Sequence, residues 1–137
     1  MSLSHSEIAP CPLCSQKELE LDRELRMWVR EVRQKMPSAH IAWAFRGEKD
    51  QNDAFKRGAS KLQFPKSKHN TMKEGRPCSE AVDFFELKDG KASWDKAFFQ
   101  KIADDNSSPV IAWGGNWVTF KDYPHFQISK PTLSKGV

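Results

Sequence analysis

The chain has 137 residues, of which 38% are hydrophobic and 29% are charged, and its formal net charge is +4. This length fits one domain with a core of its own, and the composition excludes a wholly disordered chain. No apolar run approaches the roughly 18 residues of a membrane-spanning helix, and the odd number of cysteines argues against a disulfide framework.

The first third of the chain is predicted to hold a flexible arm and a helix. Residues 1–15 are rich in Ser, Pro and Cys, and they contain neither the basic nor the apolar segment of a secretion signal. From about residue 18 to residue 35 apolar side chains recur at helical spacing, and the Met36-Pro37 step ends the pattern. The members of this apolar stripe are Leu21, Leu25, Trp28, Val29 and Val32.

The remaining segments alternate between strand and helix patterns. A turn signal, Lys88-Asp89-Gly90-Lys91, predicts a hairpin, and Ser93 is a candidate N-cap for the helix that follows. The pattern predicts an α+β fold, a small antiparallel sheet with helices packed on one side, in a single domain spanning 16–130. The expected segments are a strand at 40–45, a helix at 48–57 closed by Gly58, a strand at 81–87, a helix at 94–104, strands at 110–113 and 124–128, and a loose tail at 131–137.

One stretch of the chain is strongly basic. Between Asp53 and Glu74 there is no acidic residue, which leaves the lysines and the arginine of this stretch without a neighbouring counter-charge in the sequence. The stretch is either a solvated loop or a surface that concentrates an anionic partner, such as nucleic acid or a wall polymer carrying carboxylates and phosphates. Its cations are Lys56, Arg57, Lys61, Lys66, Lys68 and Lys73.

Two of the four histidines are candidates for chemistry. His5 lies in the predicted arm, and His40 begins an apolar strand, where a structural role is expected. His69 and His125 lie in polar surroundings near carboxylates. The Cys11/Cys14 pair in the arm is either half of a structural zinc site or incidental.

Asp83 is a lone acid within an apolar strand. Burial of an unpaired carboxylate is costly, so the position predicts a partner, which can be an arginine, several backbone donors or a metal ion. Asp122 and His125 are three positions apart and would face opposite ways on a regular strand. Pro124 begins the strand, so Asp122 lies in the incoming turn and can bend toward His125. Two imidazoles and one carboxylate, from His69, Asp83 and His125, form a ligand set typical of catalytic zinc.

The order of these residues resembles a known family. Ser67-x-His69, Ser79-x-Ala81-x-Asp83 and Asp122-x-x-His125 resemble the signature of VanY-like zinc peptidases, and more narrowly the L-alanyl-D-glutamate endopeptidases used as phage endolysins. The segment 45–51 resembles the family's arginine-containing turn, and 113–126 resembles the stretch that leads to the last ligand. The resemblance covers about residues 40–128.

The resemblance implies a role for each site residue. His69, Asp83 and His125 would bind one zinc ion, and Asp122 would act as general base. The implied substrate-binding residues are Arg46, which would also polarise the scissile carbonyl, Gln51, which would support the turn of Arg46, and Ser67. His69 and Asp83 are fourteen positions apart, a longer spacing than the family pattern has, so residues 73–76 are expected to bulge as a loop.

The implied function is cleavage of the peptidoglycan stem peptide, at the L-Ala-D-Glu bond, by a phage or prophage endolysin in host cell lysis. The enzyme would be a monomer without nucleic-acid partners or stable membrane insertion. It would stay in the host cytoplasm without a signal peptide until a holin releases it to the wall. The alternatives are a D-Ala-D-Ala carboxypeptidase of the same fold and a non-catalytic basic module that binds wall polymer or nucleic acid.

Overall fold

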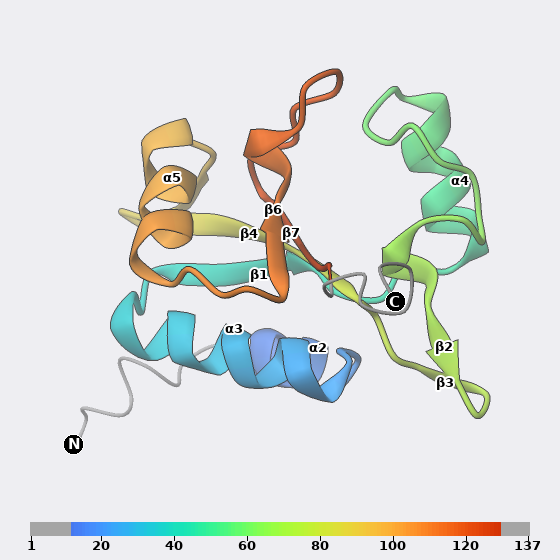
Figure 1. Ribbon diagram of the computed structural model, residues 1–137, viewed down its shortest axis with the longest axis horizontal. Helices are drawn as coiled ribbons and strands as arrows, with labels where there is room; N and C mark the ends of the chain where they lie inside the picture. The colour runs from blue at the N-terminus through green and yellow to red at the C-terminus, as the bar shows by residue number, and fades with distance from the viewer. Residues whose placement is uncertain (1–11, 130–137) are drawn as a thin grey trace, which may run out of the picture.

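The computed structural model describes residues 12–129 (Figure 1). A five-stranded antiparallel sheet has the order β1-β4-β7-β6, with β5 paired to β4, and a separate two-stranded hairpin joins β2 and β3. The elements are α2 (Pro12–Glu18), α3 (Arg23–Lys35), β1 (Ala39–Trp43), α4 (Glu48–Lys56), a 3-10 turn (Lys68–Asn70), β2 (Met72–Lys73), β3 (Arg76–Pro77), β4 (Ala81–Lys88), β5 (Lys91–Ser93), α5 (Lys96–Asp105), β6 (Ile111–Trp113), a second 3-10 turn (Gly114–Asn116) and β7 (His125–Ile128).

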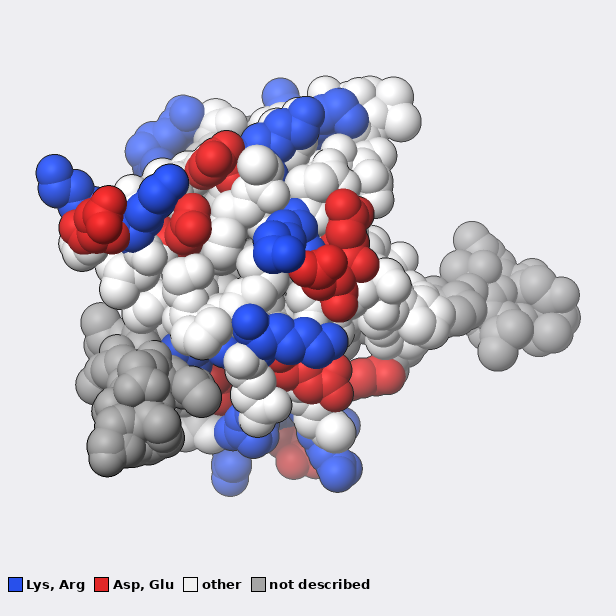
Figure 2. Space-filling view, turned by 90° about the vertical axis from the view of Figure 1, so that its left-hand side faces the viewer, with Lys and Arg blue, Asp and Glu red and all other residues white. Residues whose placement is uncertain are grey.

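The α+β fold with a small antiparallel sheet, predicted from the sequence, is confirmed. Helices α2 and α3 run along one side of the sheet, and α4 and α5 lie at opposite ends of the molecule (Figure 1). None of the helices within residues 12–129 is long and apolar enough to cross a bilayer. The face toward α5 carries cationic and anionic side chains intermixed (Figure 2).

A single core joins α3, the sheet and α5. Trp28 of α3 contacts the rings of Phe84 on β4 and Phe126 on β7, with centroids 6.1 and 5.3 Å away. Phe99 of α5 is fully buried in the same cluster. The predicted apolar stripe of α3 is therefore core, as its helical spacing indicates.

The helix predicted over residues 18–35 begins only at Arg23, because Glu18 ends α2 and residues 19–22 form the turn between α2 and α3. Asp22 caps α3 by accepting a hydrogen bond from the Glu24 amide at 3.0 Å. The backbone of the turn pairs with Ser79: the Asp22 amide donates to the Ser79 carbonyl, and the Ser79 amide donates to the Glu20 carbonyl, both at 2.8 Å. These bonds take the backbone groups that a continuous helix would need, and they tie the turn to the segment that leads into β4.

The arm predicted over residues 1–15 needs correction at its end. Residues 12–15 belong to α2, and Cys14 is only 1% exposed in the core, where its sulfur accepts from the Ile41 amide at 3.4 Å. Packing against β1 orders this segment. Residues 1–11, with His5 and Cys11, and the predicted tail lie outside the described residues.

Helix α5 also begins later than predicted. Asp95, and not Ser93, is its N-cap, because the Asp95 carboxylate accepts from the Ala97 amide at 3.2 Å. Ser93 instead ends β5, paired with Glu86. The predicted hairpin turn is present, with Asp89 and Gly90 both at positive φ.

The strand register places the candidate residues. Asp83 on β4 pairs with His125 on β7 on one side and with Trp43 on β1 on the other. Phe84, the next residue, points into the core and is fully buried. Because side chains alternate along a strand, burial of Phe84 turns Asp83 to the opposite face of the sheet.

A buried ion network ties α2 to α3, and it generates a stability prediction. The Glu18 carboxylate accepts from Arg33 at 2.9 Å and from Arg30 at 2.8 Å, and the Glu18 and Arg33 side chains are only 10% and 8% exposed. We expect Glu18→Ala to lower the free energy of unfolding by about 3–5 kcal/mol, because it leaves a buried guanidinium unpaired. Exposed Glu31 is the matched control, with an expected change within about 0.5 kcal/mol for Glu31→Ala in urea unfolding. Equal effects of the two substitutions would contradict this reading.

Candidate active site

The candidate residues lie in a cleft of about 450 Å³. One wall is the segment 57–69 that follows α4, the other is the segment 117–125 that leads into β7, and the open face of β1, β4 and β7 forms the floor. The cleft is lined by Arg46, Ser67, His69, Asp83, Asp122 and His125, all of them predicted site residues.

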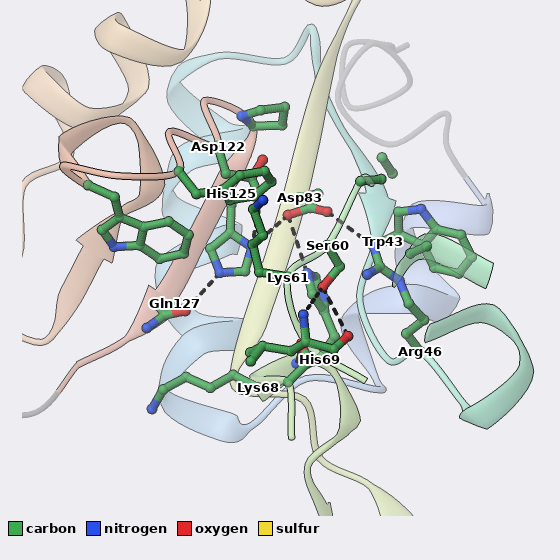
Figure 3. Close-up of a pocket in the computed structure, with 18 of the residues that line it drawn as sticks. Trp43, Arg46, Ser60, Lys61, Lys68, His69, Asp83, Asp122, His125 and Gln127 are labelled. Atoms are coloured by element: carbon green, nitrogen blue, oxygen red, sulfur yellow. Dashed lines mark hydrogen bonds and ion pairs between the residues drawn. The ribbon is translucent and has the colours of Figure 1, made fainter. Parts of the chain in front are cut away.

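Three of the predicted residues converge on one point. The Asp83 Oδ1 lies 3.3 Å from the His69 Nε2 and 3.0 Å from the His125 Nδ1. One potential ligand atom from each residue lies within 4.8 Å of the other two. Figure 3 shows Asp83 between the two imidazoles. Within residues 12–129 this is the one cluster of three His, Cys, Asp or Glu side chains with the spacing of a metal site.

Both imidazoles are oriented by the ring nitrogen that faces away from the cluster. The His69 Nδ1 lies 2.8 Å from the Ala44 carbonyl, and the His125 Nε2 lies 2.8 Å from the Gln127 Oε1. With a metal ion bound, each outer nitrogen would donate its proton to its oxygen partner and the inner nitrogen would turn its lone pair to the ion. Without an ion the inner nitrogens hydrogen-bond Asp83. Histidine ligands of metal ions usually have such an arrangement. The donor set of two imidazole nitrogens and one carboxylate therefore fits a zinc ion with a position left open.

A capped turn holds His69 in place. The Ser67 hydroxyl accepts a hydrogen bond from the His69 amide at 3.1 Å, and the Ser67 amide donates to the Asn70 Oδ1 at 3.0 Å. The Arg46 amide donates to the His69 carbonyl at 2.9 Å and fixes the turn to the end of β1. Ser67 lines the cleft, and these contacts give it a positioning role beside the predicted contact with substrate.

Arg46 is fixed beside Asp83 from two sides. Its Nη2 lies 3.5 Å from the Asp83 Oδ2, and its guanidinium stacks over the Trp43 ring with 4.7 Å to the centroid. Its Nη1 donates to the Gln51 Oε1 at 3.2 Å. Burial lowers the pKa of Arg46, and the neighbouring Asp83 opposes that change.

The predicted contact of Gln51 with substrate is wrong. Gln51 is fully buried and lies behind Arg46, outside the cleft lining. Its amide nitrogen donates to the Leu62 carbonyl at 2.6 Å and to the Ser60 hydroxyl at 2.9 Å. Its side chain thus joins the turn of Arg46 to the cleft wall, which is the supporting part of the predicted role.

Asp122 lies next to the cluster without belonging to it. Its Oδ2 is 3.8 Å from the His125 Nδ1, in the turn before β7 where the sequence predicts it. The Asp122 amide donates to the Gly114 carbonyl at 3.1 Å, and a Cβ at Gly114 would meet the Asp122 carbonyl oxygen at 2.4 Å. Only glycine at this position allows the turn to approach so closely.

The surroundings of Asp83 and Asp122 shift the pKa values of the two carboxylates in opposite directions. Burial opposes the ionised form of Asp83, but His69 and His125 outweigh it and lower the pKa of Asp83 below its ordinary value. Burial, together with the negative charge of Asp83, raises the pKa of Asp122 to about 6. Two acids whose environments push their pKa values apart are typical of a site where one holds charge and the other exchanges a proton.

His40, the other histidine within residues 12–129, lies elsewhere, and two cleft residues in contact with His125 were not predicted. His40 contacts the Cys14 sulfur at 3.6 Å and the Phe85 ring, as expected of a structural residue. Gln127 and Trp117 line the cleft, and the Trp117 ring lies 5.1 Å from the His125 ring. The position of Gln127 two residues after His125, on the same face of a strand, was the signal that could have identified it.

Two known proteins are similar to this chain, one in sequence and one in fold. No family model matches the chain. A stretch of 104 residues, 64% of the chain, is 29% identical to the peptidoglycan L-alanyl-D-glutamate endopeptidase CwlK of Bacillus subtilis (strain 168) and spans 59% of that protein's length. The crystal structure of the L-Ala D-Glu endopeptidase ChiX of Serratia marcescens has the same fold, with a TM-score of 0.65 and 22% identity over 85% of this chain and 86% of that one.

The fold and the site together define a small α+β domain with a candidate metal centre. The chain is similar in sequence to CwlK over 104 residues and shares its fold with ChiX, and its site residues follow the order that resembles the VanY-like zinc peptidases.

The contact between Gln127 and His125 generates a prediction on metal affinity. We expect Gln127→Ala to weaken zinc binding about 10–100-fold, because loss of the hydrogen bond at the outer nitrogen frees the ring to turn. Gln100→Ala is the control, since Gln100 is exposed on α5 and bonds Asp104. Competition titration with a chromogenic chelator measures both constants, and an unchanged zinc affinity in Gln127→Ala would remove Gln127 from the site.

Proposed function

We propose that the protein is a zinc-dependent peptidoglycan hydrolase that cuts the stem peptide at the L-Ala-D-Glu bond. The observation that carries the proposal is the convergence of His69, Asp83 and His125, with Arg46 and Asp122 on either side, in one open cleft. Similarity to CwlK and the fold shared with ChiX support the bond and the substrate.

The residues around the cluster suit amide hydrolysis. When bound, zinc would supply a Lewis acid and make hydroxide available near neutral pH. Asp122 would take the proton from the attacking water as its oxygen joins the amide carbon, and it would deliver a proton to the departing amine as the C–N bond breaks. A pKa of about 6 leaves Asp122 ionised at neutral pH and still basic enough to accept a proton.

Arg46 would act on the carbonyl oxygen. Its guanidinium is anchored by Gln51 and Trp43, so it is fixed before substrate binds. A fixed cation beside the carbonyl stabilises the negative charge that develops on oxygen during attack.

The hydrolase activity can be tested by adding the protein to cells stripped of their outer membrane and following the loss of turbidity. We expect lysis by the zinc-loaded protein, no lysis with a chelator, and recovery after zinc is added back. Mass spectrometry of the digested wall then identifies the bond: a new N-terminal glutamate on the released peptide supports the L-Ala-D-Glu bond, whereas release of free D-Ala would contradict it.

Asp122→Asn separates the proton-transfer role from metal binding. We expect it to keep zinc and to lower kcat by roughly 10²–10⁴-fold, the usual contribution of a general base. Asp104→Asn, on the exposed side of α5, is the control and should keep the wild-type rate. Near-wild-type turnover in Asp122→Asn would exclude Asp122 from proton transfer.

We also propose that the enzyme acts as a phage or prophage endolysin in lysis of the host. The motif resemblance to endolysins supports this role, and a monomer released from the cytoplasm through a holin would be its expected form. Expression in a bacterial host with and without a co-expressed holin tests it. Lysis that depends on the holin supports the proposal, and lysis without it contradicts that route.

A further inference from the structure

The cleft has a basic rim, formed by Arg57, Lys61, Lys66 and Lys68, which are four of the six cations of the acid-free stretch. The acidic side chains that line the cleft, Asp83 and Asp122, lie at its centre beside the histidines. A ligand that enters the cleft therefore meets positive charge at one wall before it reaches the candidate metal centre.

Most of this positive charge has no partner within the described part of the chain. Lys68 pairs with Glu80 at 3.6 Å, but Arg57, Lys61 and Lys66 form no ion pair among residues 12–129. Other exposed lysines do pair, as Lys101 does with Asp105 at 2.9 Å. Charges on the face toward α5 are also intermixed (Figure 2). Lys56, Lys73, Lys88 and Lys91 also form no ion pair among residues 12–129, so the cleft wall is distinguished by the gathering of three unpaired cations around one cavity.

Lys61 is held at the mouth by an aromatic ring. Its Nζ lies 5.2 Å from the centroid of Phe120, which lines the cleft from the opposite wall. Figure 3 shows Lys61 among the side chains around the candidate centre. A cation–π contact places the ammonium without using a carboxylate acceptor, so its N–H donors remain available to a ligand.

We propose that Lys61 binds the free carboxylate of the residue on the amine side of the scissile bond and makes the enzyme selective for carboxylated over amidated stems. This inference rests on the proposed function. In an L-Ala-D-Glu bond the glutamyl residue carries two carboxyl groups, one of which continues the stem and the other of which remains free. A lysine ammonium pairs with a carboxylate and gains much less from a neutral carboxamide.

Two synthetic stem peptides test the selectivity, identical except that the free glutamyl group is a carboxylate in one and a carboxamide in the other. We expect Lys61→Met to raise KM about 10-fold for the carboxylate peptide, with kcat and the carboxamide kinetics unchanged. Lys61→Arg should restore the preference. Lys56→Met removes the same charge from an exposed position of the same stretch that lies outside the cleft lining, and it should leave both substrates unaffected.

A binding measurement separates this inference from the proposed function. Calorimetric titration of both peptides into the zinc-loaded Asp122→Asn protein, with and without Lys61→Met, reports carboxylate selectivity without cleavage. Equal affinity for the two peptides, or an equal loss for both in Lys61→Met, would overturn the role of Lys61. Failure of the wild-type enzyme to cut either peptide, with selective binding retained, would instead overturn the proposed bond.

Discussion

The structure depends on one carboxylate held between two imidazoles. Asp83 lies on the central strand of the sheet, where burial of Phe84 on the core side turns it outward and the register with β7 sets it opposite His125. Burial alone would make this carboxylate costly. His69 and His125 offset that cost and lower the pKa of Asp83. The contacts that allow this carboxylate to be buried in the sheet are therefore the same contacts that form the candidate site.

Contacts outside the cluster of His69, Asp83 and His125 hold the two walls of the cleft in place. Gln51 is buried and bonds Arg46, the backbone at Leu62 and the hydroxyl of Ser60, so α4 and the basic wall form one unit. On the other wall the Trp113 indole donates to the Tyr123 carbonyl at 2.7 Å. Fixed walls place charged groups around a reacting amide without reorganisation at the moment of reaction, which is the main source of electrostatic catalysis.

The helices, the strands and the three-residue cluster could be predicted from the sequence more accurately than the ends of the helices and the contacts that support the site. Asp83 could be identified because an acid between Val82 and Phe84 needs a partner, and Asp122 because Pro124 fixes where the strand begins. The division at Asp22 was missed, since it depends on pairing with Ser79, which is distant in the sequence. The burial of Gln51 behind Arg46 is likewise a tertiary property that spacing does not encode, so the resemblance grouped Gln51 with the substrate-binding residues.

The long spacing between His69 and Asp83 leaves the cluster intact because the inserted residues close on themselves. β2 and β3 form a hairpin, with Glu74 and Gly75 at positive φ in its turn, as the expected bulge. The Cys78 amide donates to the Thr71 carbonyl at 2.9 Å and closes the base, while the Glu80 amide donates to the Lys68 carbonyl at 2.9 Å. Both ends of the insertion are thus pinned next to the two ligands. Length added beyond these bonds changes the outer surface of the molecule and leaves the distance from His69 to Asp83 unchanged.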